Sequence, residues 1–390
     1  MHPKRQDIDL NAALAPFGRS GTGAIAMEAG NTNWSWRLAD DTLFTVFVDS
    51  DTAAAARLVG MLQHFEAHGL TTNRVVPTSA GAPLGDVLGL PTMLKSWMPG
   101  HTLIQPRPDE LVALGREVAT LHSIPPVKGL PCDHLFGIPE AATVVGSGLD
   151  DGFEGALDAA LKRLLPVMSS ELPRGLIHGD LFGDNIVQQG DKVSIIDFEE
   201  ASLSPLVADL GMALVGVCSP GAVADADLGT ALLRGYIGGR SLSEAEWDAL
   251  PDVTALAAWS CASWRFWRYH ISRPIPERAQ LHLEMVRLAK AWPSSVRSIR
   301  TQLATKRLAG PGDLKRPLDE PCVEDHAGHA QQAHNEKPSK VHVEGTRRPG
   351  AHRVGQGGQR ADGDPESAVL AHDEVCAASA GGQDVLKART

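Results

Sequence analysis

The sequence has few of the features that mark secreted, membrane-bound or zinc-stabilised proteins. Its five cysteines are widely spaced and include no Cys-x-x-Cys pair, which fits neither a disulfide framework nor a zinc site and indicates a reducing cytoplasm. The longest apolar run, Leu210–Cys218, is about half as long as a bilayer crossing requires. No apolar stretch follows Lys4 and Arg5, so we expect no secretory signal. We therefore expect a cytoplasmic protein that does not contact membranes.

An excess of positive charge is also absent, since the formal net charge is −11. Nucleic-acid binding requires a basic face that displaces counterions, so it is not expected. Hydrophobic residues make up 43% of the 390-residue chain, which suits a globular protein with a sizeable core.

The last 80 residues contain no Phe, Trp, Tyr, Ile or Met. Such a segment buries too little apolar surface to offset its ordering entropy, so 311–390 is predicted to be a disordered tail. Six of the fifteen histidines lie there, which leaves a metal-binding tail as an alternative. The remaining chain is divided into an N-terminal extension (1–19), a first lobe (20–98) and a second lobe (99–310).

The first lobe reads mostly as strands with one helix. Ser50 or Asp51 is placed to cap the helix and Gly69 to end it, and its apolar residues recur at helical spacing. The strands are predicted at Ala24–Glu28, Trp34–Ala39, Thr42–Val48, Arg74–Thr78 and Pro91–Met98.

From Pro108 onward the pattern is mainly helical. Pro251 is expected to interrupt one of the helices, and Trp292 to end the last. After two helices around Leu114 and Leu161, the later ones are predicted at Val207–Cys218, Asp227–Ile237, Glu244–Tyr269 and Glu277–Trp292.

The segment between Gly175 and Phe198 carries the chemistry. Asp180 lies in a loop after a short apolar strand, Asn185 follows five positions later, and Asp197 lies 17 positions after Asp180. A carboxylate in such a loop can hold an acceptor hydroxyl in line with a phosphate and take its proton, so Asp180 is the predicted base.

A metal site is predicted beside this base. Mg²⁺ prefers oxygen ligands, which Asn185 and Asp197 would supply. A hairpin that turns through Gln189–Lys192 would return Asp197 to Asn185. His178 is assigned to the catalytic loop as its organiser.

These residues carry a family resemblance. The runs Ile-His-Gly-Asp-Leu-Phe-Gly-Asp-Asn at 177–185 and Ile-Ile-Asp-Phe at 195–198 resemble the aminoglycoside phosphotransferase superfamily, which is similar in fold to protein kinases. With the runs at 28–33, 97–100 and 264–268, they most resemble its homoserine kinase type II-like branch. The resemblance implies an α+β, two-lobed fold, with a small antiparallel sheet and one helix before a larger, mainly helical lobe that carries the catalytic hairpin.

The resemblance also implies roles. Asp180 would be the catalytic base, Asn185 and Asp197 would bind Mg²⁺, and Asp209 would brace the catalytic loop. ATP would lie between a phosphate loop and a hinge that holds adenine through backbone groups. The residues concerned are Gly30, Asn31, Thr32 and Asn33 in the loop and Lys95, Trp97 and Met98 in the hinge.

The sequence departs from the family pattern at two positions. Most kinases place a phosphate-binding Lys on the third strand, whereas this chain has Thr45 there. This loss fits the homoserine-kinase-like branch, which often lacks that Lys. Arg37 or Arg57 would then supply the cation, unless each is a surface charge. Glu199 follows Asp-Phe, a pattern closer to choline-kinase-like enzymes, so the substrate stays open.

Substrate contacts are predicted in an aromatic and basic cluster at Trp264, Arg265 and Arg268. An amino-acid substrate would need Arg for its carboxylate and an acid such as Glu199 for its ammonium. The alternative is that the tryptophans are core residues and the arginines are surface residues.

The sequence thus predicts an ATP-dependent kinase that phosphorylates a hydroxyl of a small amine-bearing metabolite, with homoserine as first choice. An aminoglycoside or other antibiotic phosphotransferase and a choline/ethanolamine-type kinase are the alternatives. From another class, the missing Lys would fit a nucleotide-binding pseudokinase, although the presence of Asp180, Asn185 and Asp197 argues for an enzyme. The oligomeric state is not predicted.

Overall fold

In the computed structural model, the described residues are 4–27, 33–48, 50–168 and 171–308. Several predictions fall outside them, namely the tail at 311–390 and the phosphate-loop residues Gly30, Asn31 and Thr32.

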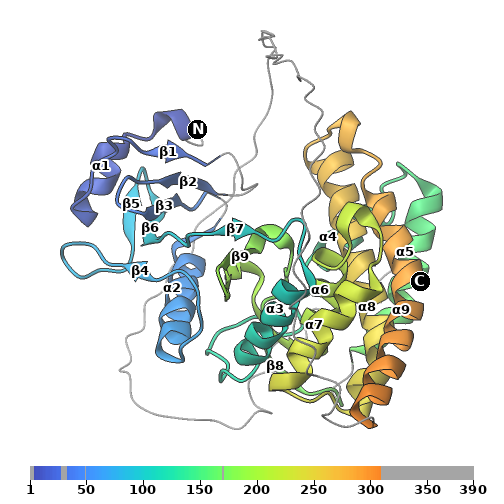
Figure 1. The fold of residues 1–390 in the computed structure, drawn as a ribbon. Coiled ribbons are helices and arrows are strands. Elements are labelled where there is room, and N and C mark those ends of the chain that lie inside the picture. The colour runs from blue at the N-terminus through green and yellow to red at the C-terminus, as the bar shows by residue number, and fades with distance from the viewer. Residues whose placement is uncertain (1–3, 28–32, 49, 169–170, 309–390) are drawn as a thin grey trace, which may run out of the picture. The chain divides into compact units, whose positions relative to one another are not determined.

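The first lobe is built on a six-stranded antiparallel sheet in the order β1-β2-β3-β6-β4, with β5 also paired to β6 (Figure 1). The predicted strands are confirmed but are shorter than expected, and β5 was not predicted. The strands are β1 Ile25–Ala26, β2 Trp34–Arg37, β3 Thr42–Val46, β4 Val75–Val76, β5 Gly85–Val87 and β6 Leu90–Ser96.

One face of this sheet is covered by residues that precede the first strand. Helix α1 (Leu10–Leu14) and the turn after it bury Leu14 and Phe17 against Phe44 of β3, with the two Phe ring centroids 6.0 Å apart. Leu94 of β6 completes the cluster. The segment that the sequence treats as an extension therefore packs on the lobe.

The opposite side of the lobe carries helix α2 (Thr52–Ala67). Its predicted cap is confirmed, because the Asp51 side chain accepts a hydrogen bond from the Ala54 amide at 2.7 Å. The predicted apolar stripe is also buried. It ends at Phe65, whose ring lies 4.5 Å from that of Phe198 beside the catalytic loop.

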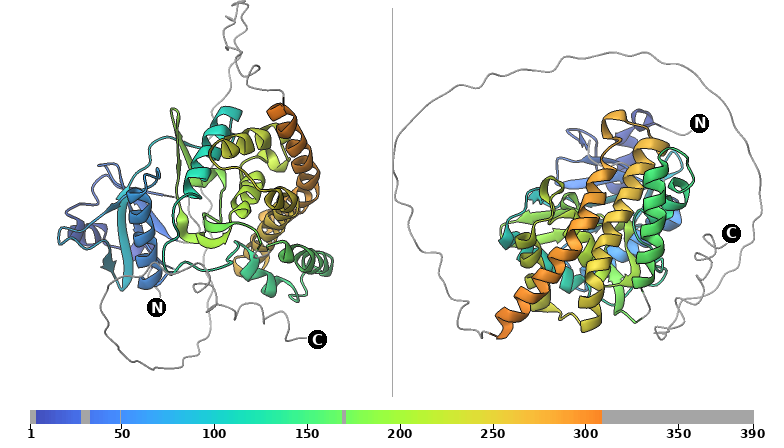
Figure 2. Two further views of the ribbon diagram at one scale, coloured as in Figure 1. Left: turned by 90° about the horizontal axis from the view of Figure 1, so that it is seen from below. Right: turned by 90° about the vertical axis from the view of Figure 1, so that its right-hand side faces the viewer.

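The second lobe is mainly helical, as expected, and its helices α8 and α9 pack along each other (Figure 2). No helix in the described ranges is long and apolar enough to cross a membrane. The helices are α3 Pro108–Leu121, α4 Ile138–Val144, α5 Asp151–Leu164, α6 Val207–Gly216, α7 Ala226–Gly239, α8 Glu244–Phe266 and α9 His282–Leu308.

Two helix predictions, the break at Pro251 and the end of the last helix at Trp292, were wrong. Helix α8 continues through Pro251. The helix is buried around its whole circumference, at Leu250, Val253 and most later residues, and this packing outweighs one lost backbone hydrogen bond. Helix α9 continues through Pro293 to Leu308, so Trp292 lies within it.

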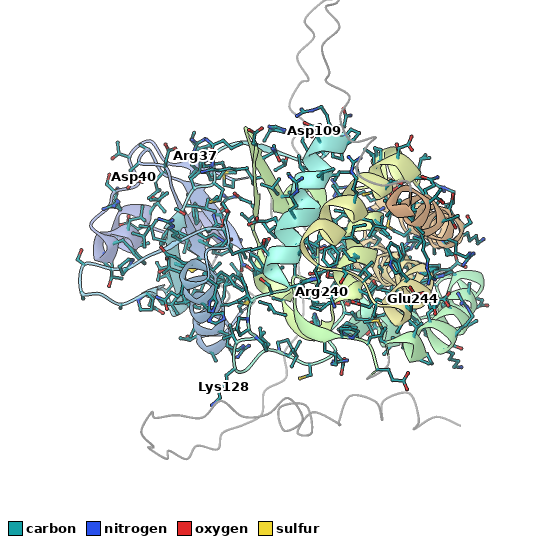
Figure 3. All side chains as sticks on the ribbon, turned by 60° about the horizontal axis from the view of Figure 1, so that its bottom comes forward. Arg37, Asp40, Asp109, Lys128, Arg240 and Glu244 are labelled. Carbon is teal, nitrogen blue, oxygen red and sulfur yellow. The ribbon has the colours of Figure 1, made fainter. Side chains whose placement is uncertain are left out.

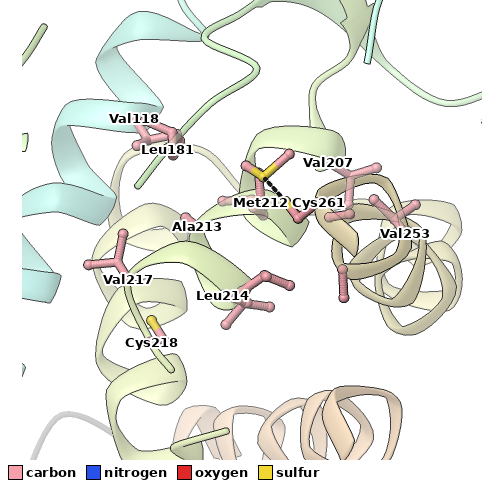
Figure 4. Close-up of a cluster of buried hydrophobic side chains, with 14 of the residues drawn as sticks. Val118, Leu181, Val207, Met212, Ala213, Leu214, Val217, Cys218, Val253 and Cys261 are labelled. Atoms are coloured by element: carbon pink, nitrogen blue, oxygen red, sulfur yellow. Dashed lines mark hydrogen bonds between the residues drawn. The ribbon is translucent and has the colours of Figure 1, made fainter. Parts of the chain in front are cut away.

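In this lobe, charged side chains lie at the surface and apolar side chains form the interior. Asp109 lies in the first turn of α3 at the surface, where a carboxylate faces the positive helix end (Figure 3). The interior around α6 is apolar, and the Cys261 thiol lies 3.7 Å from the sulfur of Met212 (Figure 4). The core therefore surrounds the helix that directly follows the catalytic segment.

Helices α3 and α7 approach each other through glycines. A Cβ at Gly115 would lie 2.2 Å from the carbonyl oxygen of Leu232, and a Cβ at Gly235 would lie 2.1 Å from that of Val112. Such distances are below van der Waals contact, so the two backbones touch. This crossing holds the end of α3 beside α7, where both helices contribute to the site.

We expect Gly115→Ala to lower the free energy of unfolding by about 3 kcal/mol or more, since overpacking against backbone cannot relax by a rotamer change. Gly60→Ala is the matched control, because a Cβ at Gly60 in α2 meets nothing within 4 Å. It should stabilise the protein by about 0.5–1 kcal/mol. Urea unfolding measures both, and equal effects would contradict the described crossing.

Candidate active site

A hairpin places the predicted metal ligands side by side. Strand β9 (Ile186–Gln189) pairs antiparallel with β10 (Lys192–Ile195), with Ile186 opposite Ile195. The Ile196 amide donates a hydrogen bond to the Asn185 carbonyl at 2.9 Å. Asp197 follows directly, so the hairpin returns it to Asn185 as the sequence predicts.

The lobe junction also contacts this hairpin. Strand β7 (His101–Thr102) pairs with β9. Gly100, which precedes it, has φ 138° and lies so close to β9 that a Cβ would meet the Gln188 carbonyl oxygen at 2.2 Å. Only glycine allows the chain to pass here. The segment between the lobes is thereby joined to the strand that carries the site.

The predicted base, Asp180, is held by the predicted metal ligand. The Nδ2 of Asn185 donates to both the backbone oxygen and Oδ2 of Asp180, each at 2.9 Å. Burial raises the pKa of Asp180 to about 7, and nearby carboxylates, first that of Asp197, contribute to the rise. A carboxylate in this state can exchange a proton near neutral pH.

The donor set beside Asp180 suits Mg²⁺. Because Asn185 uses its Nδ2 to bind Asp180, its Oδ1 is left as an acceptor, and the backbone of the hairpin returns Asp197 to this residue. Asp197 adopts φ 67°, a left-handed conformation rare for a residue with a Cβ. Both groups offer oxygen only, which matches a hard cation. Among the described residues, this site included, no three His, Cys, Asp or Glu side chains are grouped to hold a metal, so the pair depends on the amide oxygen of Asn185.

His178 connects the loop to the hairpin. Its Nδ1 accepts from the Asp180 amide at 3.1 Å, and its Nε2 lies 2.9 Å from the Ile196 carbonyl oxygen. Since a carbonyl can only accept, Nε2 carries the proton and the ring is neutral. The ring also packs edge-on against Phe198. These contacts use both nitrogens and support the predicted role of loop organiser.

Asp209, in the first turn of α6, accepts hydrogen bonds from the catalytic loop. Its two carboxylate oxygens bind the amides of His178 at 2.7 Å and Gly179 at 2.8 Å. The Nε2 of His122, at the end of α3, lies 3.1 Å from the same carboxylate, and its Nδ1 lies 2.8 Å from the hydroxyl of Tyr236 on α7. Sequence reasoning found Asp209 but missed His122 and Tyr236, because their pairing depends on the α3–α7 crossing.

The nucleotide side of the site is only partly described. Lys95 lies on β6, and the amide of Trp97 already donates to the Asp41 carbonyl at 2.9 Å, so it is not free for adenine. The Arg37 guanidinium covers the Trp97 ring at 4.6 Å. Met98, which completes the predicted hinge, is half-buried.

Asn33 joins the predicted phosphate loop to the metal segment. Its Nδ2 donates to Glu199 at 2.7 Å, and its Oδ1 accepts from the Val48 amide at 3.2 Å. Glu199 lies two residues after Asp197, so this contact brings the end of the phosphate loop to the metal segment.

The predicted substrate cluster is engaged elsewhere. Arg265 binds Glu284 at 2.9 Å and the Leu281 carbonyl at 3.0 Å, near the start of α9. The Trp264 ring packs on Phe136, with centroids 5.4 Å apart. Helix α8 ends at Phe266 and a π-helical turn, Trp267–Ser272, follows, so Arg268 does not continue the predicted α-helical face. A role in substrate binding stays a prediction for these residues.

Sequence reasoning missed a group of ionisable residues beside the loop. His134 lies 2.6 Å from Glu200, a contact that raises the pKa of His134. Burial raises the pKa of Glu140 on α4, and the charge of Glu200 adds to it. The Glu200 backbone lies against the loop, since a Cβ at Gly179 would meet its oxygen at 2.7 Å. No motif marks His134 or Glu140; only the fold brings them here.

Comparison with known proteins identifies the family of the chain. Residues 24–253 match the phosphotransferase enzyme family. The chain belongs to this family. The phosphotransferase is 30% identical over 241 residues to the homoserine kinase of Rhizobium johnstonii. The aligned residues cover 59% of this chain and 75% of that protein. It is 31% identical over 265 residues to the homoserine kinase of Methylocella silvestris, covering 65% and 83%.

Solved structures show the same fold. A choline/ethanolamine kinase family protein from Mesorhizobium loti superimposes with a TM-score of 0.55 at 16% identity, over 75% of the phosphotransferase and 100% of that chain. The predicted α+β, protein-kinase-like, two-lobed fold is thereby confirmed. The phosphotransferase is a small-molecule kinase with a hydroxyl acceptor, as the sequence predicts.

We expect Asp209→Ala to lower the free energy of unfolding by about 3 kcal/mol or more, because two backbone amides and His122 lose their acceptor and each unpaired buried donor costs about 1–3 kcal/mol. Tyr236→Phe, which removes only the hydroxyl next to His122, should cost about 1 kcal/mol. Urea unfolding compares the variants, and amide exchange at His178 and Gly179 should accelerate in Asp209→Ala. An Asp209→Ala variant as stable as Tyr236→Phe would contradict the network.

Proposed function

We propose that the phosphotransferase transfers the γ-phosphate of ATP, bound with Mg²⁺, to the hydroxyl of a small amine-bearing metabolite, with homoserine as the first candidate. The observation that carries the proposal is the double hydrogen bond from Asn185 to Asp180. It fixes the base and leaves the amide oxygen of Asn185 unused, so that a base and a metal ligand lie in one place, as phosphoryl transfer requires.

In this proposal Asp180 accepts the hydrogen bond of the acceptor hydroxyl, aligns its oxygen with the γ-phosphorus and takes the proton as the bond forms. Asn185 Oδ1 and the Asp197 carboxylate would hold Mg²⁺, which neutralises negative charge on the phosphates. His178 keeps Asp180 and the hairpin in register through its two ring nitrogens. Phosphoryl transfer needs positioning and charge compensation above all, and these contacts provide the positioning.

An amine-bearing acceptor is supported by the negative charge around the base. The charges of Asp197, Asp184 and Glu200 all raise the pKa of Asp180, after burial. A positively charged group on the acceptor would oppose this rise and favour the ionised base. Glu200 lies against the loop at Gly179 and its charge acts on Glu140, and both carboxylates would attract such a group. A neutral alcohol would bring no such compensation.

The relatives named homoserine kinases favour homoserine among the amine-bearing acceptors. The Asp-Phe-Glu run at 197–199 supports choline or ethanolamine as the second candidate class. A pseudokinase is less well supported, because Asp180, Asn185 and Asp197 are brought together in a connected arrangement. A scaffold that only binds nucleotide has no need of the base.

We expect wild-type protein to release ADP from Mg²⁺-ATP most rapidly with L-homoserine, in a coupled assay that also contains choline, ethanolamine, an amino sugar and an aminoglycoside as separate acceptors. Turnover should require Mg²⁺ and should stop when it is chelated. Faster turnover with another acceptor would replace homoserine in the proposal. ATP binding without turnover on any acceptor would favour the pseudokinase.

Asp180→Asn should lower kcat by about 100-fold or more, since a general base contributes about 10²–10⁴ to the rate. ATP affinity should stay within about threefold, because the side chain keeps its shape and its position next to Asn185. Asp191→Asn, at an exposed turn position of the same hairpin, is the control and should keep wild-type turnover. Full activity in Asp180→Asn would overturn its assignment as the base.

A further inference from the structure

Most kinases bind ATP phosphates with a Lys on the third strand, and the structure shows why none of the expected substitutes fills that role. Thr45 is buried in β3 and lies within hydrogen-bonding distance of the Ser35 hydroxyl, at 3.1 Å. Arg37 is bound to Asp41 at 2.7 Å. Arg57 is exposed on α2. The nucleotide site therefore lacks a cation from each of these positions.

Lys95 on the neighbouring strand lies on the same sheet face as Thr45. In the antiparallel pair of β3 and β6, Leu43 is opposite Lys95 and Thr45 is opposite Met93. Directly paired residues share a face, and so do residues two apart along a strand. Lys95 therefore projects on the side of Thr45, away from the cluster on the other face that contains Phe44.

The acid on α2, Glu66, is paired with Arg74 at 3.4 Å rather than with Lys95. The buried face of α2 is apolar throughout, from Leu58 to Phe65. Within the described residues, the side chain of Lys95 forms no hydrogen bond or salt bridge. Its four-carbon stem is long and flexible, which allows the ammonium to reach several ångströms from the strand.

Glu199, two residues after the predicted metal ligand Asp197, is an acid close enough to feel the charge of Lys95. The same carboxylate accepts a hydrogen bond from Asn33 at 2.7 Å. A negatively charged group thus lies where Lys95, the end of the phosphate loop and the metal segment converge.

We propose that the Lys95 ammonium binds the phosphates of ATP from β6, in place of the missing third-strand Lys. The inference rests on the proposed function, since it assumes ATP as the donor. The phosphates take over the Asn33 contact from the Glu199 carboxylate. No covalent step involves Lys95, which supplies only positive charge.

Isothermal titration of ATP, ADP and adenosine to the full-length protein tests this role. Lys95→Met should weaken ATP and ADP binding by about ten- to a hundredfold, the range expected for a charge-assisted contact. Adenosine affinity should stay within about twofold, since it carries no phosphate. Lys128→Met is the matched control, because Lys128 is exposed in the connection after α3 and points away from the ribbon (Figure 3).

Two further variants keep the test decisive. Lys95→Gln carries the same comparison if Lys95→Met does not fold, as judged by thermal unfolding. Adding Thr45→Lys to Lys95→Met returns an ammonium to the same sheet face and should recover most of the lost ATP affinity. If Lys95 were only a structural residue, the added Thr45→Lys would not restore ATP affinity.

Unchanged ATP affinity in both Lys95 variants, with normal ATP binding by wild type, would overturn the inference and leave the proposed function standing. An equal loss of ATP and adenosine affinity would also overturn it, since it would place Lys95 at the adenine ring rather than at the phosphates. Absence of ATP binding in the wild-type protein would overturn the proposed function and the inference together.

Discussion

The site depends on one buried carboxylate. Asp209 accepts the amides of His178 and Gly179, so the loop that carries the base is fastened to the first turn of α6 by two hydrogen bonds to a charged group. His122 and Tyr236 extend this fastening to α3 and α7. Without an acceptor of full charge, the donors would be buried and unpaired, and the loop would have no fixed position relative to the helices.

Charge is unevenly distributed around this fixed loop. Burial and the charges of Asp197, Asp184 and Glu200 raise the pKa of Asp180, and Glu199 lies beside the same carboxylates, where the charge of Lys95 also acts. A site with such an excess of carboxylates is completed by cations that its ligands bring, which fits Mg²⁺ and an ammonium group on the acceptor. The same reasoning supports the proposal that a cation on the first lobe, Lys95, binds the phosphates.

Local chemistry was predictable from the sequence because it depends on short spacings. The hairpin that joins Asn185 to Asp197 and the Asp51 cap follow from turn and capping rules that act within a few residues. The continuation of α8 through Pro251 was not predictable in this way, because burial on all sides decides it. Likewise, His134 and Glu140 meet the catalytic loop only through tertiary packing, and no spacing in the sequence marks them.

The most direct test of the account is the product of the reaction, followed by ³¹P NMR with Mg²⁺-ATP and L-homoserine. The account predicts a phosphomonoester signal that grows in step with ADP and is absent when homoserine is replaced by 2-aminobutyrate, which lacks the hydroxyl. ADP and inorganic phosphate without a phosphomonoester, for homoserine and for the other amine-bearing alcohols, would contradict it. Such a result would mean that the loop held by Asp209 does not direct phosphate to an acceptor.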